Sequence, residues 1–138
     1  MKIDIVKDEK AAIGNYKPVL VSGDNIDFFN ISDAECEEVR AINIMDTFST
    51  QNLHKNFTSI LKKVRLGGKL VVSGIDCNIL SRQLVSSQID ESAFSNVVSE
   101  CNSMSSLRVM ASAIKSSGFT IESQKISGTF YEIVAKRG

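Results

Sequence analysis

The stretch Leu61–Asp76, LKKVRLGGKLVVSGID, decides the fold of this chain. It reads as the end of an amphipathic helix, a turn at Gly67 and Gly68, and a strand over Lys69–Ile75 with an apolar centre. Asp76 stands where that strand runs out. Because ligands of open α/β sheets bind beyond the carboxyl ends of parallel strands, Asp76 marks one wall of a candidate site.

The residues before this stretch predict the helix that leads into it. Ser49 or Thr50 can cap its start, and Gly67 is expected to cap its end. One apolar face recurs at the helical period: Leu53, Phe57, Ile60, Leu61 and Val64.

The remaining pattern predicts strands that alternate with helices. Strands are expected at Lys2–Val6, Pro18–Ser22, Val39–Met45, Phe119–Ile126 and Thr129–Lys136, with Ile26–Phe29 as strand or loop. Helices are expected from Ser32 through Glu37, twice within Asn78–Ser103, and from Ser105 or Ser106 to Gly118. This order predicts a mostly parallel α/β sheet with a C-terminal antiparallel hairpin. The apolar centre of Lys69–Ile75 further predicts helices on both faces of the sheet.

Length and composition restrict the class of protein. A chain of 138 residues is expected to be one domain, residues 1–138. The net charge is zero, with 16 basic and 16 acidic residues, so there is no electrostatic case for nucleic acid or an anionic membrane as the main partner. Three cysteines without a CxxC spacing and a single histidine make no plausible metal set. No membrane span or leader is evident, and a cytoplasmic location with reduced thiols is expected.

Three segments together resemble the class I S-adenosylmethionine-dependent methyltransferases: Val39–Phe48, Leu61–Asp76 and Gly118–Lys136. The second resembles the family's "L-K-P-G-G-x-L-hydrophobic" landmark, and the third its C-terminal "G-F-strand-turn-strand" unit. The likeness is to short members that lack the first crossover helix. It implies a three-layer Rossmann-like methyltransferase sheet, trimmed in its N-terminal half, and S-adenosylmethionine as cofactor.

The chain departs from the family where the cofactor is held. Relatives have a glycine-rich turn after the first strand, but this chain has Val6–Lys10, VKDEK. Relatives have an acidic residue at the end of the second strand, where this chain has Leu20. The relatives' "L-E-H" corresponds to Met45-Asp46-Thr47. The resemblance therefore implies a degenerate cofactor site.

Five polar residues are the candidates for cofactor binding under this resemblance: Asp24, Asp27, Asn30, Asp46 and Asp76. Each also has a plain structural interpretation, as a turn residue, a helix cap or a strand-end carboxylate. No catalytic residue is identified. The single histidine, His54, lies one position past an apolar helix residue and is expected to be a solvated surface side chain.

Two functions remain open at this point. The chain is either a small enzyme that transfers a methyl group to an unknown small-molecule acceptor, or a non-catalytic binding or assembly module with a protein partner. A compact module of the second kind would suit a virus or another small genome. The unpaired edge of the terminal hairpin is a candidate for pairing with a second copy in a homodimer.

Overall fold

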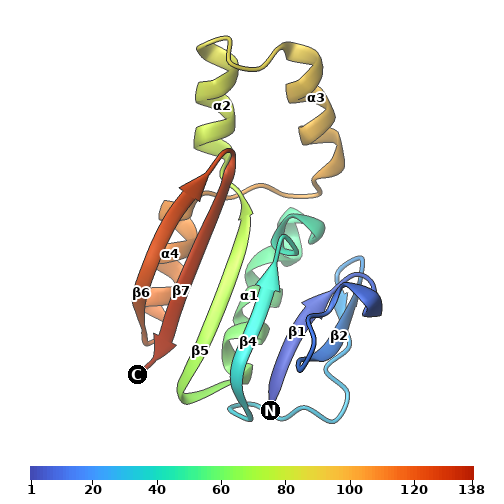
Figure 1. The fold of residues 1–138 in the computed structure, drawn as a ribbon, viewed down its shortest axis with the longest axis vertical. Coiled ribbons are helices and arrows are strands. Elements are labelled where there is room, and N and C mark those ends of the chain that lie inside the picture. Colours follow the sequence, from blue (N-terminus) through green and yellow to red (C-terminus); the bar gives the residue numbers. More distant parts are fainter.

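Seven strands form one mixed sheet in the order β3-β2-β1-β4-β5-β7-β6 (Figure 1). The computed structural model describes residues 1–138. The strands β2, β1, β4 and β5 are parallel to one another, while β3 is antiparallel to β2 and β7 runs antiparallel between β5 and β6. The predicted α/β sheet with an antiparallel C-terminal hairpin is thus confirmed. The strand bounds are β1 Lys2–Val6, β2 Lys17–Ser22, β3 Asn25–Ile26, β4 Cys36–Ile42, β5 Val64–Ile75, β6 Phe119–Ser127 and β7 Phe130–Arg137.

The helices are concentrated in the second half of the chain. They are α1 Thr50–Lys63, α2 Cys77–Val85, α3 Glu91–Glu100 and α4 Leu107–Ser116, with short 3-10 turns η1 Glu9–Ala11 and η2 Met45–Thr47. The apolar faces of α1 and α4 share one core with the sheet, so both helices cover the same face. The inward strand residues of that core are fully buried: Ile3, Ile5, Val39, Ala41, Leu70, Val72, Ile133 and Ala135.

The opposite face of the sheet carries no helix, which corrects the expectation of helices on both faces (Figure 1). Between β1 and β4 the chain forms the strands β2 and β3 and the turn η1 but no α-helix, so the trimming removes the third layer. This outer face carries charged side chains that pair across the strands, beside half-buried apolar ones such as Val71 and Val134. The Arg40 guanidinium lies 3.7 Å from Asp4, and the Lys69 ammonium lies 3.6 Å from Glu38. Charged side chains can be solvated there, so this face does not need a covering helix.

The predicted helix into β5 is confirmed, but its end is not where the glycines suggested. The helix α1 stops at Lys63, and Val64 already pairs with Cys36 of β4. The next pair is Glu38 with Lys69, so β5 bulges between these two positions. Gly67 has a φ of 77° and serves this bulge rather than the helix cap.

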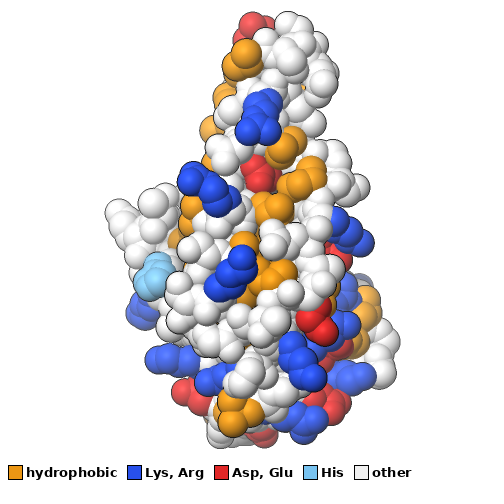
Figure 2. Space-filling model, turned by 90° about the vertical axis from the view of Figure 1, so that its left-hand side faces the viewer, with side chains coloured by type: hydrophobic (Ala, Val, Ile, Leu, Met, Phe, Trp, Pro, Cys, Tyr) orange, Lys and Arg blue, Asp and Glu red, His pale blue; other side chains and the backbone are white.

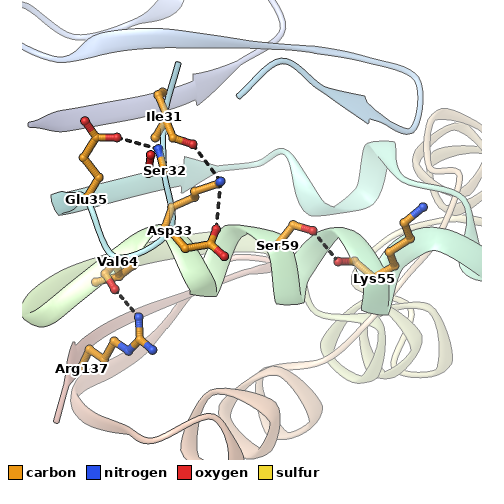
Figure 3. A network of polar contacts seen from close by, with 9 residues as sticks. Ile31, Ser32, Asp33, Glu35, Lys55, Ser59, Val64 and Arg137 are labelled. Carbon is orange, nitrogen blue, oxygen red and sulfur yellow. Dashed lines mark hydrogen bonds and ion pairs between the residues drawn. The ribbon is translucent and has the colours of Figure 1, made fainter. Parts of the chain in front are cut away.

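The short helix predicted from Ser32 is wrong, because that segment is held as an irregular connection (Figure 3). Lys63 at the end of α1 donates to the Ile31 carbonyl at 2.9 Å and to Asp33 at 3.0 Å. The Ser32 N–H donates to the Glu35 carboxylate instead of starting a helix. These contacts fix the path from β3 into β4.

The helices α2 and α3 form an arch beyond the carboxyl edge of the sheet (Figure 1). Only Leu80 of α2 is buried, and α3 buries no residue at all. Hydrophobic side chains reach the surface in this upper part of the molecule (Figure 2), among them Val85 at 85% and Val98 at 37% exposure. No helix of the structure combines the length and apolarity that crossing a bilayer demands.

Gly74 of β5 leaves space for the aromatic ring of Tyr131 on β7. The two residues are paired in register, and Tyr131 is fully buried. A Cβ atom at Gly74 would lie 2.9 Å from the Tyr131 hydroxyl oxygen and 3.1 Å from a ring carbon. The sheet can therefore hold this phenol only above a glycine.

We expect Gly74→Ala to destabilise the protein by about 1–3 kcal/mol, because the added methyl group forces Tyr131 out of a filled core. Urea unfolding followed by circular dichroism measures the change. Gly14→Ala is the matched control, since a Cβ there meets nothing within 4 Å. Equal stabilities of the two variants would contradict the close packing of Tyr131 on Gly74.

Candidate functional site

The carboxyl ends of the parallel strands meet at one edge of the sheet. The strand β1 ends at Val6, β2 at Ser22, β4 at Ile42 and β5 at Ile75. The residues that follow these ends are where a ligand of an open α/β sheet would bind. This edge is the candidate site.

A cavity of about 370 Å³ opens beside the ends of β1 and β4. Its polar lining includes Asp4, Lys7 and Asp8 from the N-terminal segment, with Arg40 of β4 and Asn43 directly after that strand. The volume lies within the roughly 300–1,000 Å³ of small-molecule sites. Asp4 is not free to bind a ligand, since it faces Arg40 and accepts the Ile13 N–H at 3.2 Å.

The connection from β1 to β2 occupies the place of a cofactor loop. Asp8 caps the turn η1 by accepting the Lys10 N–H at 3.0 Å. The N–H groups of Ala11 and Ala12 donate to the carbonyls of Asp8 and Glu9. These backbone donors are therefore used within the connection. The N–H groups of Lys10, Ala11 and Ala12 are thus not available to a nucleoside cofactor while this turn is formed.

Asp24 follows β2 and holds the start of α1. Its carboxylate accepts the Ser49 N–H at 2.6 Å, the Ser49 hydroxyl at 2.8 Å and the Asn52 amide at 2.9 Å. These bonds, led by the Ser49 N–H, lower the pKa of Asp24 below its ordinary value. Since a carboxylate has about four acceptor positions, little of Asp24 is left for the two hydroxyls of a ribose.

Asp27 and Asn30 lie after β3, on the connection toward β4. Asp27 is exposed and accepts the Phe29 N–H at 3.2 Å, which is a local turn. Asn30 is exposed and has a φ of 62°, a conformation that asparagine tolerates. Neither side chain is brought to Asp46 or Asp76 by a hydrogen bond.

Asp46 lies in η2, directly after β4, and is half-buried. One of its carboxylate oxygens accepts the Ile75 N–H at 3.2 Å, which joins the ends of β4 and β5. Burial raises the pKa of Asp46, and the Ile75 N–H and the Lys7 ammonium oppose this shift. Of the five predicted residues, Asp46 therefore has the environment most typical of a reactive carboxylate.

Asp76 is 4% exposed and connects three elements. One carboxylate oxygen accepts the N–H groups of Asn78 and Ile79 at the start of α2, at 2.9 and 3.0 Å. The other accepts the N–H of Leu107, the first residue of α4, at 2.8 Å. Its position beyond the β5 end agrees with the sequence, but all its contacts are structural.

Two buried hydroxyl groups close to this edge were not predicted from the sequence. The hydroxyls of Tyr131 and Ser105 are buried and do not reach hydrogen-bonding geometry with each other or with any other atom. Burial raises the pKa of Tyr131, and the nearby Ser105 hydroxyl opposes the shift. Only the alternating apolar pattern of the terminal hairpin hinted that Tyr131 points inward. No three His, Cys, Asp or Glu side chains come together as a metal site.

We expect Asp76→Ala to cost about 2–4 kcal/mol of stability, since it removes one helix cap and leaves the buried Leu107 N–H unpaired. Asp90→Ala is the matched control. Asp90 caps only α3, through the Ala93 N–H, and its loss should cost about 0.5–2 kcal/mol. Denaturant midpoints measure both. A smaller loss for Asp76→Ala than for Asp90→Ala would contradict the double role.

Asp24→Asn should lower the melting temperature at pH 7, because the charged carboxylate is the better acceptor for Ser49 and Asn52. The folded pKa lies below the ordinary 3.8, so the stabilisation is complete above that value and is lost as pH falls below it. The difference in melting temperature between the variant and wild type should therefore shrink as the pH falls below that value. Asp27→Asn, with one local bond, should show little gap at any pH. A difference in melting temperature between Asp24→Asn and wild type that does not shrink at all from pH 7 to the lowest pH at which wild type stays folded would refute this.

The comparisons with known proteins rest on structure alone. No family profile and no curated protein matches the sequence. An S-adenosylmethionine-dependent methyltransferase from Mesorhizobium loti has a TM-score of 0.63 at 10% identity, over 99% of this chain and 80% of that one. An O-methyltransferase family protein from Burkholderia thailandensis has a TM-score of 0.60 at 12% identity, over 89% of this chain.

This chain spans only 36% of that Burkholderia protein. A third neighbour is the Haloferax volcanii protein solved in complex with the Trm112 methyltransferase activator, with a TM-score of 0.57 and 10% identity over 92% of this chain and 64% of that one. The strand order and the reversed β7 agree with these likenesses. The chain therefore has the fold of the class I S-adenosylmethionine-dependent methyltransferases.

Proposed function

We propose that this chain is a methyltransferase-fold protein that acts as a binding or assembly module and does not turn over S-adenosylmethionine. The observation that carries the proposal is the β1–β2 connection. Asp8 closes it into a 3-10 turn, and the N–H groups of Lys10, Ala11 and Ala12 bond within it. The fold is kept while the loop that would cradle the cofactor has become a structural connection.

The condition of Asp24 supports the same proposal. In a cofactor site of this fold, a carboxylate near the end of β2 would bind the hydroxyl groups of the ribose. Here all three hydrogen bonds of the Asp24 carboxylate hold the start of α1 instead. The outer face of the sheet also supports the proposal. Charged side chains there pair with one another across the strands and are not free for a ligand. A partner in this proposal is a small molecule or a protein. The Haloferax neighbour is a precedent of the same fold in a protein complex.

A second candidate is methyl transfer with S-adenosylmethionine bound in an altered pocket. The cavity beside β1 and β4 favours it, because its volume suits a small ligand. In this candidate Asp24, Asp27, Asn30, Asp46 and Asp76 form the cofactor's surroundings. Asp46 would lie next to the acceptor, since its raised pKa suits a group that exchanges protons.

Thermal unfolding with and without millimolar S-adenosylmethionine or S-adenosylhomocysteine separates the two candidates. We expect no change in the midpoint for either compound. Bound ligand at 100 times its dissociation constant would add about 2.7 kcal/mol of stability and a visible rise in the midpoint.

A rise of the unfolding midpoint that saturates with ligand concentration would contradict the proposal of a module and support the second candidate, methyl transfer. Its loss in Asp27→Ala but not in Asp90→Ala would then place the ligand at the β2–β3 side of the carboxyl edge, because Asp90 only caps α3.

A further inference from the structure

A groove of about 470 Å³ runs between α1 and α4 on the helical side of the molecule. Its apolar lining comes from Phe57 and Leu61 of α1 and from Val109 and Ala113 of α4. Small hydroxyl side chains of α4 complete it, so another helix could approach closely. Nothing in this chain fills the groove.

The two helices that form the groove carry basic residues and no acidic ones. Neither α1 nor α4 contains an aspartate or a glutamate, although the chain as a whole has zero net charge. Their basic residues are His54, Lys55, Lys62, Lys63, Arg108 and Lys115, and His54 and Arg108 line the groove itself. Of these six, only Lys63 forms an ion pair, with Asp33. This face would attract an acidic partner.

The helix α3 of the arch has the opposite character. It carries Glu91 and Glu100, follows Asp90, and contains no basic residue. None of these carboxylates forms an ion pair within the chain. Glu100 lies at the negative end of the helix dipole, which is unfavourable until a cation approaches.

The apolar side of α3 is also only partly covered by the rest of the chain. Phe94 and Val97 are only half-buried, and Val98 is 37% exposed. These three residues are spaced as one helix face, so they could enter a groove together. An acidic helix with an exposed apolar stripe and a basic groove with an apolar lining therefore occur in the same chain.

We propose that α3 of one copy binds in the α1–α4 groove of a second copy, and that the contact is reciprocal. The stripe of Phe94, Val97 and Val98 covers the apolar lining, while Glu91 and Glu100 meet Arg108 and His54, the basic residues that line the groove. Two reciprocal contacts close the assembly as a symmetric dimer. The inference does not rest on the proposed function, because either a module or an enzyme of this fold could form this dimer.

The groove suits a protein helix better than nucleic acid. Phosphate groups are bound by cations and hydrogen-bond donors, and an apolar lining such as Phe57 and Leu61 would give them nothing. The terminal hairpin edge is a poorer dimer contact, because β6 bulges between Ile121 and Ser123 and exposes charged side chains.

Sedimentation equilibrium on the full chain over micromolar to millimolar concentration tests the proposal. We expect wild type to reach the mass of a dimer. The arm variant, Glu91→Lys with Glu100→Lys on α3, and the groove variant, His54→Glu with Arg108→Glu, should each dimerise about tenfold or more weakly, because like charges then face each other. The control, Glu122→Lys with Lys136→Glu on the terminal hairpin, should dimerise as wild type does.

An equimolar mixture of the arm and groove variants should recover the dimer. In that pair the reversed arm meets the reversed groove, and the native arm meets the native groove, so both contacts are attractive. Circular dichroism verifies that each variant is folded. Val98→Asp, which keeps all existing charges, gives a second route to a weakened dimer if a double variant fails to fold.

Several results would overturn the proposal. Wild type that stays monomeric at millimolar concentration would do so, as would a dimer unaffected by both double variants. A mixture that fails to associate would exclude the reciprocal contact, and a series of ever larger masses would exclude closure. Binding of a fluorescent 20-nucleotide single strand by wild type, lost in the groove variant while the mass is unchanged, would assign the basic face to nucleic acid instead.

Discussion

The buried carboxylate of Asp76 is the contact on which the carboxyl edge of this protein depends. It receives N–H groups from the starts of α2 and α4, and its own backbone N–H donates to Thr129 before β7. A charged acceptor at 4% exposure is tolerated because its three hydrogen bonds replace the water it has lost. The end of β5, the starts of α2 and α4 and the terminal hairpin are all positioned relative to this one residue.

The second constraint is that a sheet of parallel strands is covered on one face only. Parallel sheets normally have helices on both sides because their strands are apolar on both. Here charged outward residues of β1, β4 and β5 pair across the strands, as Asp4 does with Arg40 and Glu38 with Lys69. Tyr16 adds a planar ring over Arg40, 5.6 Å from its guanidinium carbon. The trimmed half of the fold is thus stabilised by surface chemistry and not by a second helical layer.

Much of this architecture could be predicted from periodicity. The strand Lys2–Val6 and the start of α1 agree with the pattern, because alternation and helical spacing depend on neighbours in the chain. The missing helical layer was not predictable from the apolar centre of Lys69–Ile75. Val71 there is only half-buried, and an apolar run does not tell which face is covered. The end of α1 was misplaced since Val64 pairs with Cys36, a contact distant in sequence.

The candidate site was predictable in position but less so in detail. Strand ends locate Asp46 and Asp76 at the correct edge, yet no local pattern shows that Asp76 also caps α4, thirty-one residues later. The role of Asp24 depends in the same way on Ser49 and Asn52. Carboxylates after strands are therefore easy to find, whereas the groups they bond are decided by the tertiary structure.

The shallow anchoring of α3 has a consequence for the energetics of the chain. A helix that buries no residue adds little to the cooperative unit formed by the sheet, α1 and α4, so it can open without unfolding the remainder. Its amide hydrogens should exchange with solvent long before those of β4 or β5. Substitutions and short insertions near Asp90 should therefore leave the fold of the sheet, α1 and α4 intact.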